Sequence, residues 1–141
     1  MTILLIEDNR QFSELVELSI TDADIHVVET LDAAKGWLST FRADLILVDL
    51  GLPDSQGLDT LKALSFTRVP KVVLTAAEEC PDKAAELGAA DFVRKGNARE
   101  ITERIRFHIK RLDKKPRFAP EIFRQIVEYI EMPRRELVGA N

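Results

Sequence analysis

Short runs of consecutive apolar residues recur along the first 112 positions and are separated by segments with a different spacing. Three runs are continuous, Thr2–Ile6, Leu45–Val48 and Lys71–Thr75, and two are weaker, Ile25–Glu29 and Asp91–Arg94. Such short continuous runs are typical of strands that are buried on both faces of a parallel sheet. The pattern therefore predicts five strands.

The segments that follow the five strands carry apolar residues at helical spacing. These positions are Phe12, Leu15, Val16, Ser19 and Ile20; Ala33, Ala34, Trp37, Leu38 and Phe41; Leu58, Leu61 and Leu64; Ala84 to Leu87; and Ile101, Ile105, Ile109 and Leu112. Alternation of strand and helix implies parallel strands joined by right-handed crossovers. We predict an α/β fold, a doubly wound five-stranded parallel sheet with helices on both faces. In this fold Trp37 is a core residue, whereas His26 and His108 lie at the surface or its boundary.

The pattern changes after Leu112, where residues 113–117 are mostly charged. Pro120 suits the first position of a helix and Glu121 its first turn. The apolar residues of this helix share one face and end before Pro133; they are Ile122, Phe123, Ile126, Val127 and Ile130. We expect a domain over 1–112, followed over 113–141 by a charged linker and an extra amphipathic C-terminal helix. The sequence leaves open whether this tail packs on its own domain, pairs with another copy, binds another protein or begins a longer chain.

Composition places the chain among soluble globular proteins, with 45% apolar and 31% charged residues. No uncharged apolar run approaches the roughly 20 residues of a membrane helix. The N-terminal apolar run stops at Glu7 and Asp8, too early for a signal peptide. The single Cys80 cannot form an internal disulfide. We therefore expect a cytoplasmic protein without a membrane segment.

Charge is segregated along the chain, although the net charge is only −4. Residues 1–93 carry 7 basic and 17 acidic side chains, and residues 94–117 carry 10 basic and 3 acidic ones. The basic residues of the last predicted helix alternate with its apolar stripe, and Phe107 is the one aromatic residue among them. We interpret this helix as having a solvated basic face, and we do not expect nucleic acid as a partner.

Polar and charged side chains stand where four of the five predicted strands end. Glu7 and Asp8 follow the first strand, Asp49 the third and Lys95 the fifth, and Thr75 ends the fourth. If the strand order is 2-1-3-4-5, the first and third strands are neighbours and their three carboxylates converge. Their mutual repulsion is relieved by a hard divalent cation such as Mg²⁺, which binds few carboxylates and completes its octahedron with water and phosphate oxygens.

An aspartate beside a metal ion and a lysine is equipped to attack a phosphoryl group. The cation and the Lys95 ammonium offset the charge on the transferring oxygens, and the Thr75 hydroxyl is available to the product phosphoryl group. Each residue also has a structural interpretation, such as a helix cap, a solvated lysine or a hydroxyl that bonds to the backbone. Their joint placement favours the chemical interpretation.

Four blocks of sequence resemble the CheY-like receiver domains of two-component response regulators. The blocks are Ile3–Asn9, Leu45–Leu58, Val72–Ala76 and Gly88–Lys95, and the resemblance spans about residues 1–112. It implies a flavodoxin-like sheet of order 2-1-3-4-5 and transfer of a phosphoryl group from a kinase phosphohistidine to Asp49.

The resemblance also implies a role for each site residue. Asp49 is the phosphorylated residue, Asp8 a direct magnesium ligand, Glu7 a ligand acting through water, and the Gly51 carbonyl a third protein ligand. Lys95 pairs with the phosphoryl group.

A conformational switch is the second implication of the resemblance. Thr75 moves toward the new phosphoryl oxygen, and Phe92 rotates into the vacated space. This alters the surface made by the fourth helix, fifth strand and fifth helix. A core position for Phe92 is equally compatible with the sequence.

The chain departs from the family pattern in three places. Gly96 follows Lys95 where many members have proline, so the geometry of that peptide is open. Only 20 positions separate Thr75 from Lys95, fewer than in typical members, which predicts a short or displaced fourth helix and makes the family's usual dimer face uncertain. Gly51 and Ala77 carry no polar side chain to orient an attacking water, so we predict slow self-dephosphorylation.

The function predicted is a receiver that takes a phosphoryl group from a histidine kinase or phosphotransfer protein onto Asp49 and then contacts a downstream protein. It assists its own phosphoryl transfer and hydrolysis, and we do not expect an enzyme with a separate substrate. The residues after 112 are too few for a DNA-binding or enzymatic output domain. The sequence leaves open the kinase, the stimulus, the output partner and whether the chain forms a homodimer.

Three other kinds of protein share parts of this sequence pattern. A pseudo-receiver, a constitutive interaction module that never uses Asp49, has the same sequence pattern. A dehalogenase-type phosphatase expects a second acid at position 51, which is glycine. A flavin-binding protein expects a hydroxyl- and glycine-rich phosphate loop where Glu7 and Asp8 stand.

Overall fold

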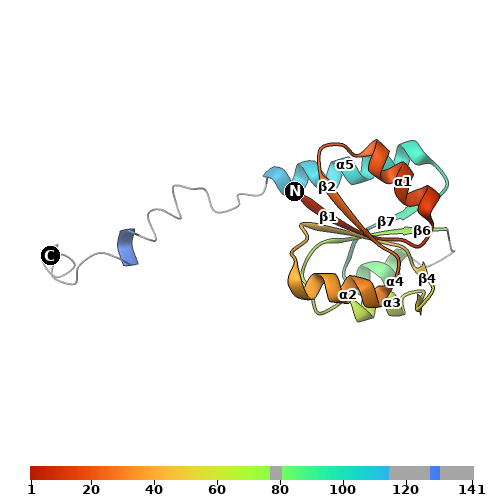
Figure 1. Cartoon of the computed structure of the whole chain (residues 1–141), viewed down its shortest axis with the longest axis horizontal. Helices are drawn as coiled ribbons and strands as arrows, with labels where there is room; N and C mark the ends of the chain where they lie inside the picture. Colours follow the sequence, from red (N-terminus) through yellow and green to blue (C-terminus); the bar gives the residue numbers. More distant parts are fainter. Residues whose placement is uncertain (77–80, 115–127, 131–141) are drawn as a thin grey trace, which may run out of the picture.

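The computed structural model describes residues 1–76, 81–114 and 128–130 (Figure 1). The elements in chain order are β1 (Thr2–Ile6), α1 (Arg10–Ser19), β2 (Asp24–Val28), α2 (Leu31–Thr40), β3 (Leu45–Val48), β4 (Gly51–Leu52), β5 (Ser55–Gln56), α3 (Asp59–Ala63), β6 (Lys71–Thr75), α4 (Pro81–Glu86), β7 (Ala89–Arg94) and α5 (Ala98–Lys114). The predicted linker and tail helix lie outside the described residues, except for a helical turn at 128–130.

Five parallel strands form the sheet, in the order β2-β1-β3-β6-β7. This is the predicted order 2-1-3-4-5, because β4 and β5 pair only with each other in a small antiparallel hairpin. Ile6, the last residue of β1, lies beside Val28 of β2 and Val48 of β3. The predicted α/β fold is therefore confirmed, and the carboxyl ends of β1 and β3 meet at one edge.

Helices cover both faces of the sheet, α1 and α5 on one and α2, α3 and α4 on the other (Figure 1). Successive side chains of a strand point to opposite faces. Ile3 and Leu5 accordingly pack with Val16 and Ile105 on the α1 and α5 side, whereas Leu4 and Ile6 belong to the cluster on the other side. Both faces of β1 are fully buried, as a continuous apolar run requires.

Helix lengths follow the sequence pattern closely. The fourth helix is short, as predicted: α4 has six residues, and the chain turns at Gly88, whose φ of 94° is readily adopted only by glycine. The fifth continues two residues beyond Leu112, to Lys114. Within the described residues, no helix is long and apolar enough to cross a membrane.

Asp54, in the turn of the β4–β5 hairpin, caps a helix that lies far from it in sequence. Its carboxylate oxygens accept hydrogen bonds from the backbone N–H groups of Leu31 and Asp32, both at 2.9 Å. These N–H groups belong to the first turn of α2, where no intrahelical acceptor is available. The hairpin after Asp49 is thereby fastened to the start of α2.

One of the aromatic predictions needs correction. Trp37 packs against the core cluster as predicted, although it is only half-buried, and its ring stacks on the exposed His26 at 5.2 Å and contacts Phe41 at 5.3 Å. His108 is not at the surface; it is only 2% exposed, because α5 turns it toward Asp91 of β7. His26 lies exposed on the edge strand β2, as predicted.

Candidate functional site

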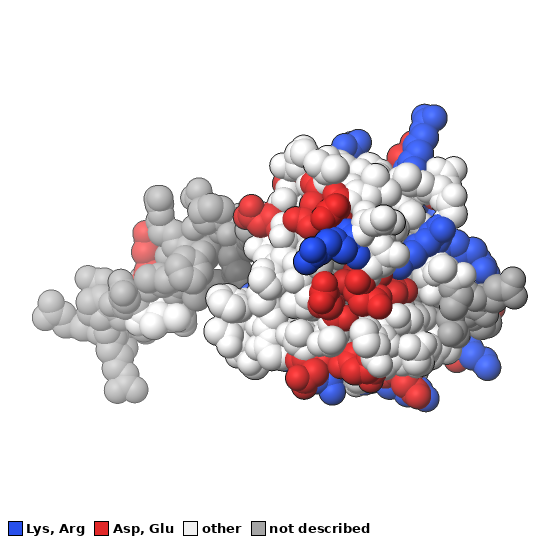
Figure 2. Space-filling model, turned by 45° about the vertical axis from the view of Figure 1, so that its right-hand side comes forward, with Lys and Arg blue, Asp and Glu red and all other residues white. Residues whose placement is uncertain are grey.

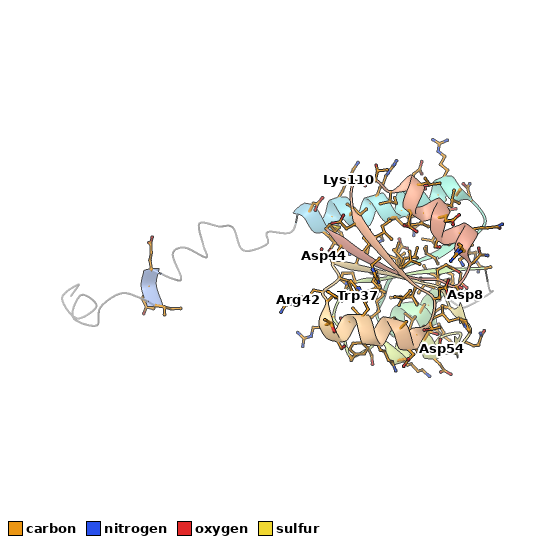
Figure 3. The ribbon with its side chains drawn as sticks, in the orientation of Figure 1. Asp8, Trp37, Arg42, Asp44, Asp54 and Lys110 are labelled. Atoms are coloured by element: carbon orange, nitrogen blue, oxygen red, sulfur yellow. The ribbon has the colours of Figure 1, made fainter. Side chains whose placement is uncertain are left out.

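Three carboxylates meet at the edge of the sheet where β1 and β3 end. Backbone hydrogen bonds align the two strand ends: the Asp49 N–H donates to the Ile6 carbonyl at 3.0 Å. Glu7, Asp8 and Asp49 each place one carboxylate oxygen within 4.8 Å of the others. Figure 3 shows Asp8 at the opposite end of the sheet from Arg42 and Asp44. The register of the parallel strands thus brings together residues that are 42 positions apart.

Burial divides the three acids into two kinds. Glu7 is 1% exposed and Asp49 is 7% exposed, whereas Asp8 lies in solvent. Glu7 and Asp8 are adjacent in sequence, so they point to different sides of the backbone. In Figure 2, turned to bring this edge forward, acidic side chains surround a smaller basic group. The cluster therefore combines two poorly hydrated carboxylates with one that solvent reaches.

Lys95 supplies the positive charge of the cluster. Its Nζ lies 2.5 Å from Glu7 Oε2 and 3.6 Å from Asp49 Oδ2, and its side chain is 14% exposed. The Phe12 ring lies beneath the ammonium at 4.4 Å, within cation–π range. Three acids against one base leave a formal charge of −2. That imbalance, with the carboxylate oxygens already gathered, suits a divalent cation with oxygen ligands.

The environment of Glu7 opposes ionisation of its carboxyl. Burial raises the pKa of the Glu7 carboxyl above 4.5, against the opposing effects of Lys95 and of the Asn9 N–H, which donates to Oε1 at 3.0 Å. Asp49 raises the same pKa by like-charge repulsion. Because the pKa of Glu7 is higher in the folded than in the unfolded state, the free energy of unfolding falls as pH rises from the unfolded to the folded pKa and Glu7 ionises.

Thr75 and Phe92 lie on the two strands beyond β3. Thr75 ends β6 and is 1% exposed; its carbonyl accepts from the Lys95 N–H at 2.9 Å, which fixes the backbone that carries the lysine. Phe92 on β7 is half-buried against the core cluster on the α4 side, with the Arg94 guanidinium 6.0 Å from its ring. Phe92 is thus partly a core residue, and part of its surface remains open.

The two glycines that mark departures from the family pattern are both described. A Cβ added at Gly51 would lie 3.7 Å from Asp49 Oδ2, an ordinary contact, so position 51 directly adjoins the carboxylate. The Lys95–Gly96 peptide is trans, as are all peptides in the described ranges. Ala77 lies outside the described residues.

Sequence reasoning missed the contacts that support the cluster. The Asn9 side chain caps α1 through the Phe12 N–H while its own N–H bonds to Glu7. An asparagine before a helical segment is a recognisable cap, but its backbone contact with Glu7 has no sequence signature. The Phe12 contact with Lys95 likewise depends on a packing that spacing alone does not reveal.

A second charged cluster, Asp91, Arg104 and His108, joins β7 to α5. Arg104 Nε donates to Asp91 Oδ2 at 2.9 Å, and His108 Nε2 lies 2.8 Å from the same oxygen. Burial raises the pKa of Asp91, but these hydrogen bonds and one from the Phe92 N–H outweigh it and lower the pKa to about 2. The cluster therefore stabilises the packing of α5 on β7 as long as Asp91 is ionised.

Replacing Asp91 with asparagine is expected to lower the free energy of unfolding at pH 7 by about 1–2 kcal/mol. Because the folded pKa lies below 3.8, this stabilisation is present above pH 3.8 and is lost as pH falls toward 2. Urea unfolding at pH 7 and at several lower pH values measures it. The exposed Asp59→Asn variant is the control; equal losses in both variants, or a loss that does not shrink in acid, would contradict the expectation.

Comparison with known proteins is consistent with this geometry. The family profile described as "Response regulator receiver domain" matches residues 3–106. The KDP operon transcriptional regulatory protein KdpE of Escherichia coli K12 is 32% identical over 115 residues, covering 77% of this chain and 51% of that protein. CpxR of the same organism is 35% identical over 114 residues, covering 77% and 49%. The chain spans about half the length of these curated relatives.

Solved structures show the same fold. The Mn²⁺-bound form of the response regulator Rcp1 superposes with a TM-score of 0.63 at 28% identity, covering 74% of this chain and 88% of that one. The bound Mn²⁺ belongs to that protein. The cluster of Glu7, Asp8 and Asp49 supplies the carboxylate ligands with which a divalent cation is compatible.

Proposed function

Because the chain belongs to the response regulator receiver domain family, we propose that it is a signalling switch that accepts a phosphoryl group on Asp49 with Mg²⁺ bound. The observation that carries the proposal is the convergence of three carboxylates and Lys95 at one end of the sheet. A constitutive interaction module would have no need for this costly concentration of buried charge.

Asp49 is the proposed acceptor because its carboxylate adjoins the other two acids and lies 3.6 Å from Lys95 Nζ, without the close ion pair that holds Glu7. One of its carboxylate oxygens forms a bond to phosphorus while the bond from phosphorus to a donor histidine nitrogen breaks, and the imidazole keeps that electron pair. The donor is a histidine kinase or a phosphotransfer protein. The chain assists its own phosphoryl transfer and does not turn over a separate substrate.

Asp8, Asp49 and the Gly51 carbonyl are the proposed direct ligands of Mg²⁺, and Glu7 acts through water. Bound Mg²⁺ supplies positive charge to the oxygens of the transferring group. Solvent reaches Asp8, so this ligand is accessible to an incoming hydrated ion, whereas Glu7 is held by Lys95 and the Asn9 N–H. Lys95 lies close enough to Asp49 to stabilise the product phosphoryl group.

The switch proposed for the phosphorylated state involves Thr75 and Phe92. The Thr75 hydroxyl moves toward the new phosphoryl oxygen, and Phe92 turns further into the protein, which alters the surface of α4, β7 and α5 for a downstream protein. The half-buried position of Phe92 supports this proposal, because the ring is already partly inserted beside α4.

A protein is the proposed downstream partner. The curated relatives named above are transcriptional regulatory proteins of about twice this length. Three basic side chains of α5 are engaged within the domain: Arg104 with Asp91, Arg99 with Glu103, and Arg106 with the Ser19 carbonyl. These contacts favour a structural role for the basic side chains over phosphate binding.

The decisive experiment is incubation of the purified chain with acetyl phosphate, with Mg²⁺ or with a chelator, followed by intact-mass measurement. We expect one phosphoryl group per chain with Mg²⁺ and at least a tenfold lower yield with the chelator. A pseudo-receiver would gain none under either condition. A yield independent of the metal would contradict the proposed site.

The phosphorylated chain is expected to lose its phosphoryl group slowly, because Gly51 offers no side chain that orients water beside Asp49. A Gly51→Asn variant places an amide next to Asp49 Oδ2 without backbone strain, and it should hydrolyse its aspartyl phosphate several-fold faster. Decay of the phosphorylated mass after removal of acetyl phosphate measures both rates, with Gly51→Ala as the matched control. Rapid loss from the unaltered chain would refute the expectation.

A further inference from the structure

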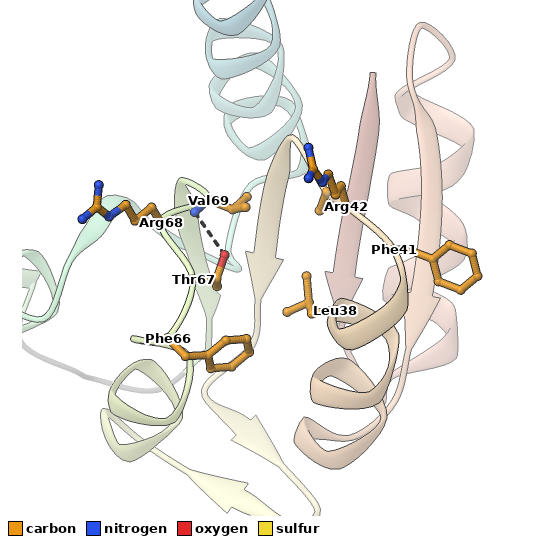
Figure 4. A pocket seen from close by; sticks show the side chains of 8 residues that line it. Leu38, Phe41, Arg42, Phe66, Thr67, Arg68 and Val69 are labelled. Atoms are coloured by element: carbon orange, nitrogen blue, oxygen red, sulfur yellow. Dashed lines mark hydrogen bonds between the residues drawn. The ribbon is translucent and has the colours of Figure 1, made fainter.

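A groove opens at the end of the sheet opposite the carboxylate cluster. It lies between the connection from α2 to β3 and the connection from α3 to β6, and its volume is about 400 Å³ (Figure 4). Leu38, Phe41, Arg42, Phe66, Arg68 and Val69 line it, and we call it the pole groove. Phe41 is 56% exposed and Phe66 is 60% exposed. Figure 4 shows the Phe66 ring turned toward Leu38, whereas the Phe41 ring points away from the cavity and contacts Trp37 at 5.3 Å. One large aromatic side chain therefore faces the groove, and a second lies exposed at its edge.

The charge of the pole groove is positive. Arg42 and Arg68 are exposed, and neither forms a hydrogen bond or ion pair with another residue in the described ranges. No acidic side chain lines the cavity. Most of the domain is acidic, since residues 1–93 carry a net −10, so these two guanidinium groups give this end of the molecule a local positive charge. An apolar segment that carries carboxylates complements this surface.

Buried Lys71 holds the wall of the groove in place. It is 6% exposed, and its Nζ donates to the carbonyls of Thr67 and Val69 at 2.7 and 3.2 Å. These residues flank Arg68, so the loop that carries this arginine is fixed by two hydrogen bonds from a buried ammonium. The groove is consequently preformed, which lowers the entropic cost of docking.

The C-terminal segment of the same chain has the required composition. Residues 120–132 contain apolar residues at helical spacing, Ile122, Ile126 and Ile130, together with three glutamates and one arginine, a net −2. In the turn that the structure describes, Tyr129 is 65% exposed and Ile130 is 73% exposed. This segment thus offers uncovered apolar side chains and carboxylates.

The connection is long enough for this segment to reach the groove. α5 ends at Lys114 at the same end of the sheet as the N-terminus (Figure 1), and the groove opens beside the starts of β3 and β6 at that end. Residues 115–119 span up to about 17 Å when extended, and a helix of thirteen residues adds about 20 Å. A domain of this size has a radius of gyration of about 13 Å. The extended connection over residues 115–119 is longer than this radius.

We propose that residues 120–132 dock in the pole groove of their own domain, with their apolar face against Leu38 and Phe66 and their carboxylates toward Arg42 and Arg68 at its rim. Covalent connection at this length gives an effective concentration on the order of millimolar, which favours the segment over a free competitor of equal affinity. The pole groove lies at the opposite end of the sheet from Asp49, so the docked contact requires no phosphoryl group.

Amide chemical shifts of the full ¹⁵N-labelled chain test the contact. An Ile126→Asp variant places a charge on the apolar face, and the amides of Phe41, Arg42, Phe66 and Arg68 are expected to shift. The matched control, Gln125→Asp, adds the same charge one position away on the polar face and should leave these four amides unchanged. No shift in either variant, or equal shifts in both, would overturn the proposal.

A spin label distinguishes docking within one chain from docking between chains. The chain with Cys80→Ser and Gln125→Cys, labelled at its one cysteine, should lose the amide signals of Phe41 and Phe66. In an equimolar mixture of ¹⁵N chain without the label and labelled chain without ¹⁵N, those signals should persist. Loss of signal in the mixture would show that the segment docks on a second copy and would overturn the intramolecular proposal.

Discussion

An Asp49→Asn variant is expected to take up no phosphoryl group from acetyl phosphate in the presence of Mg²⁺. The substitution preserves the size and hydrogen-bonding reach of the side chain but replaces the anionic oxygen that attacks phosphorus with a neutral amide. Asp49 is 7% exposed and lies 3.6 Å from Lys95 Nζ, whereas the other buried acid, Glu7, is already paired with Lys95 at 2.5 Å and with the Asn9 N–H. Intact mass measured alongside the unaltered chain gives the result directly.

Asp59→Asn is the matched control for this experiment. Asp59 lies exposed in the first turn of α3 and pairs only with the exposed Lys62 at 3.7 Å, so its loss should leave the yield unchanged. Removal of one of three crowded acids also predicts that metal-free Asp49→Asn is at least as stable as the unaltered chain toward urea. A phosphorylated Asp49→Asn chain would place the acceptor elsewhere and refute the site.

Lys95→Met is expected to combine two large losses. Phosphorylation by acetyl phosphate should slow by about a hundredfold or more, the usual effect of removing one preorganised donor to a developing anion. The variant also leaves the Glu7 carboxylate, which is 1% exposed, without the ammonium 2.5 Å away. Breaking one side of a buried ion pair lowers the free energy of unfolding by roughly 3 kcal/mol.

A double variant separates these two losses. Glu7→Gln in the Lys95→Met background removes the unpaired charge, so the free energy of unfolding should recover while phosphorylation stays slow. Because burial already raises the pKa of Glu7, the deficit of Lys95→Met should shrink as pH falls toward 4.5 and Glu7 gains a proton. Urea titrations with chelator present measure both effects. Additive losses in the double variant would show that the two side chains do not interact.

Continuous apolar runs made the central strands predictable. β1, β3 and β6 have the bounds expected from the sequence, because strands buried on both faces leave no polar residue inside them. The bounds of the edge strands are harder to predict from the sequence: β7 begins two residues before the predicted Asp91. The hairpin of β4 and β5 was missed, since strands of two residues have no period to detect.

The convergence of Glu7, Asp8 and Asp49 was predictable because it depends only on strand ends and strand order. The sequence does not predict the pairing of Lys95 with Glu7. Which of two nearby carboxylates the ammonium contacts depends on side-chain torsions and on the Phe12 ring beneath it. The predicted surface position of His108 is wrong. It lies on the buried stripe of α5 beside Ile105 and Ile109, and its acceptor Asp91 stands on another element.

Helix α2 links the two ends of the molecule. Asp54 holds its first turn to the loop after Asp49, and its last turns carry Leu38 and the chain to Phe41 at the pole groove. A ten-residue helix is a stiff rod about 15 Å long. A displacement of the loop beside the acceptor would therefore tilt this helix and shift Leu38 and Phe41 at its far end.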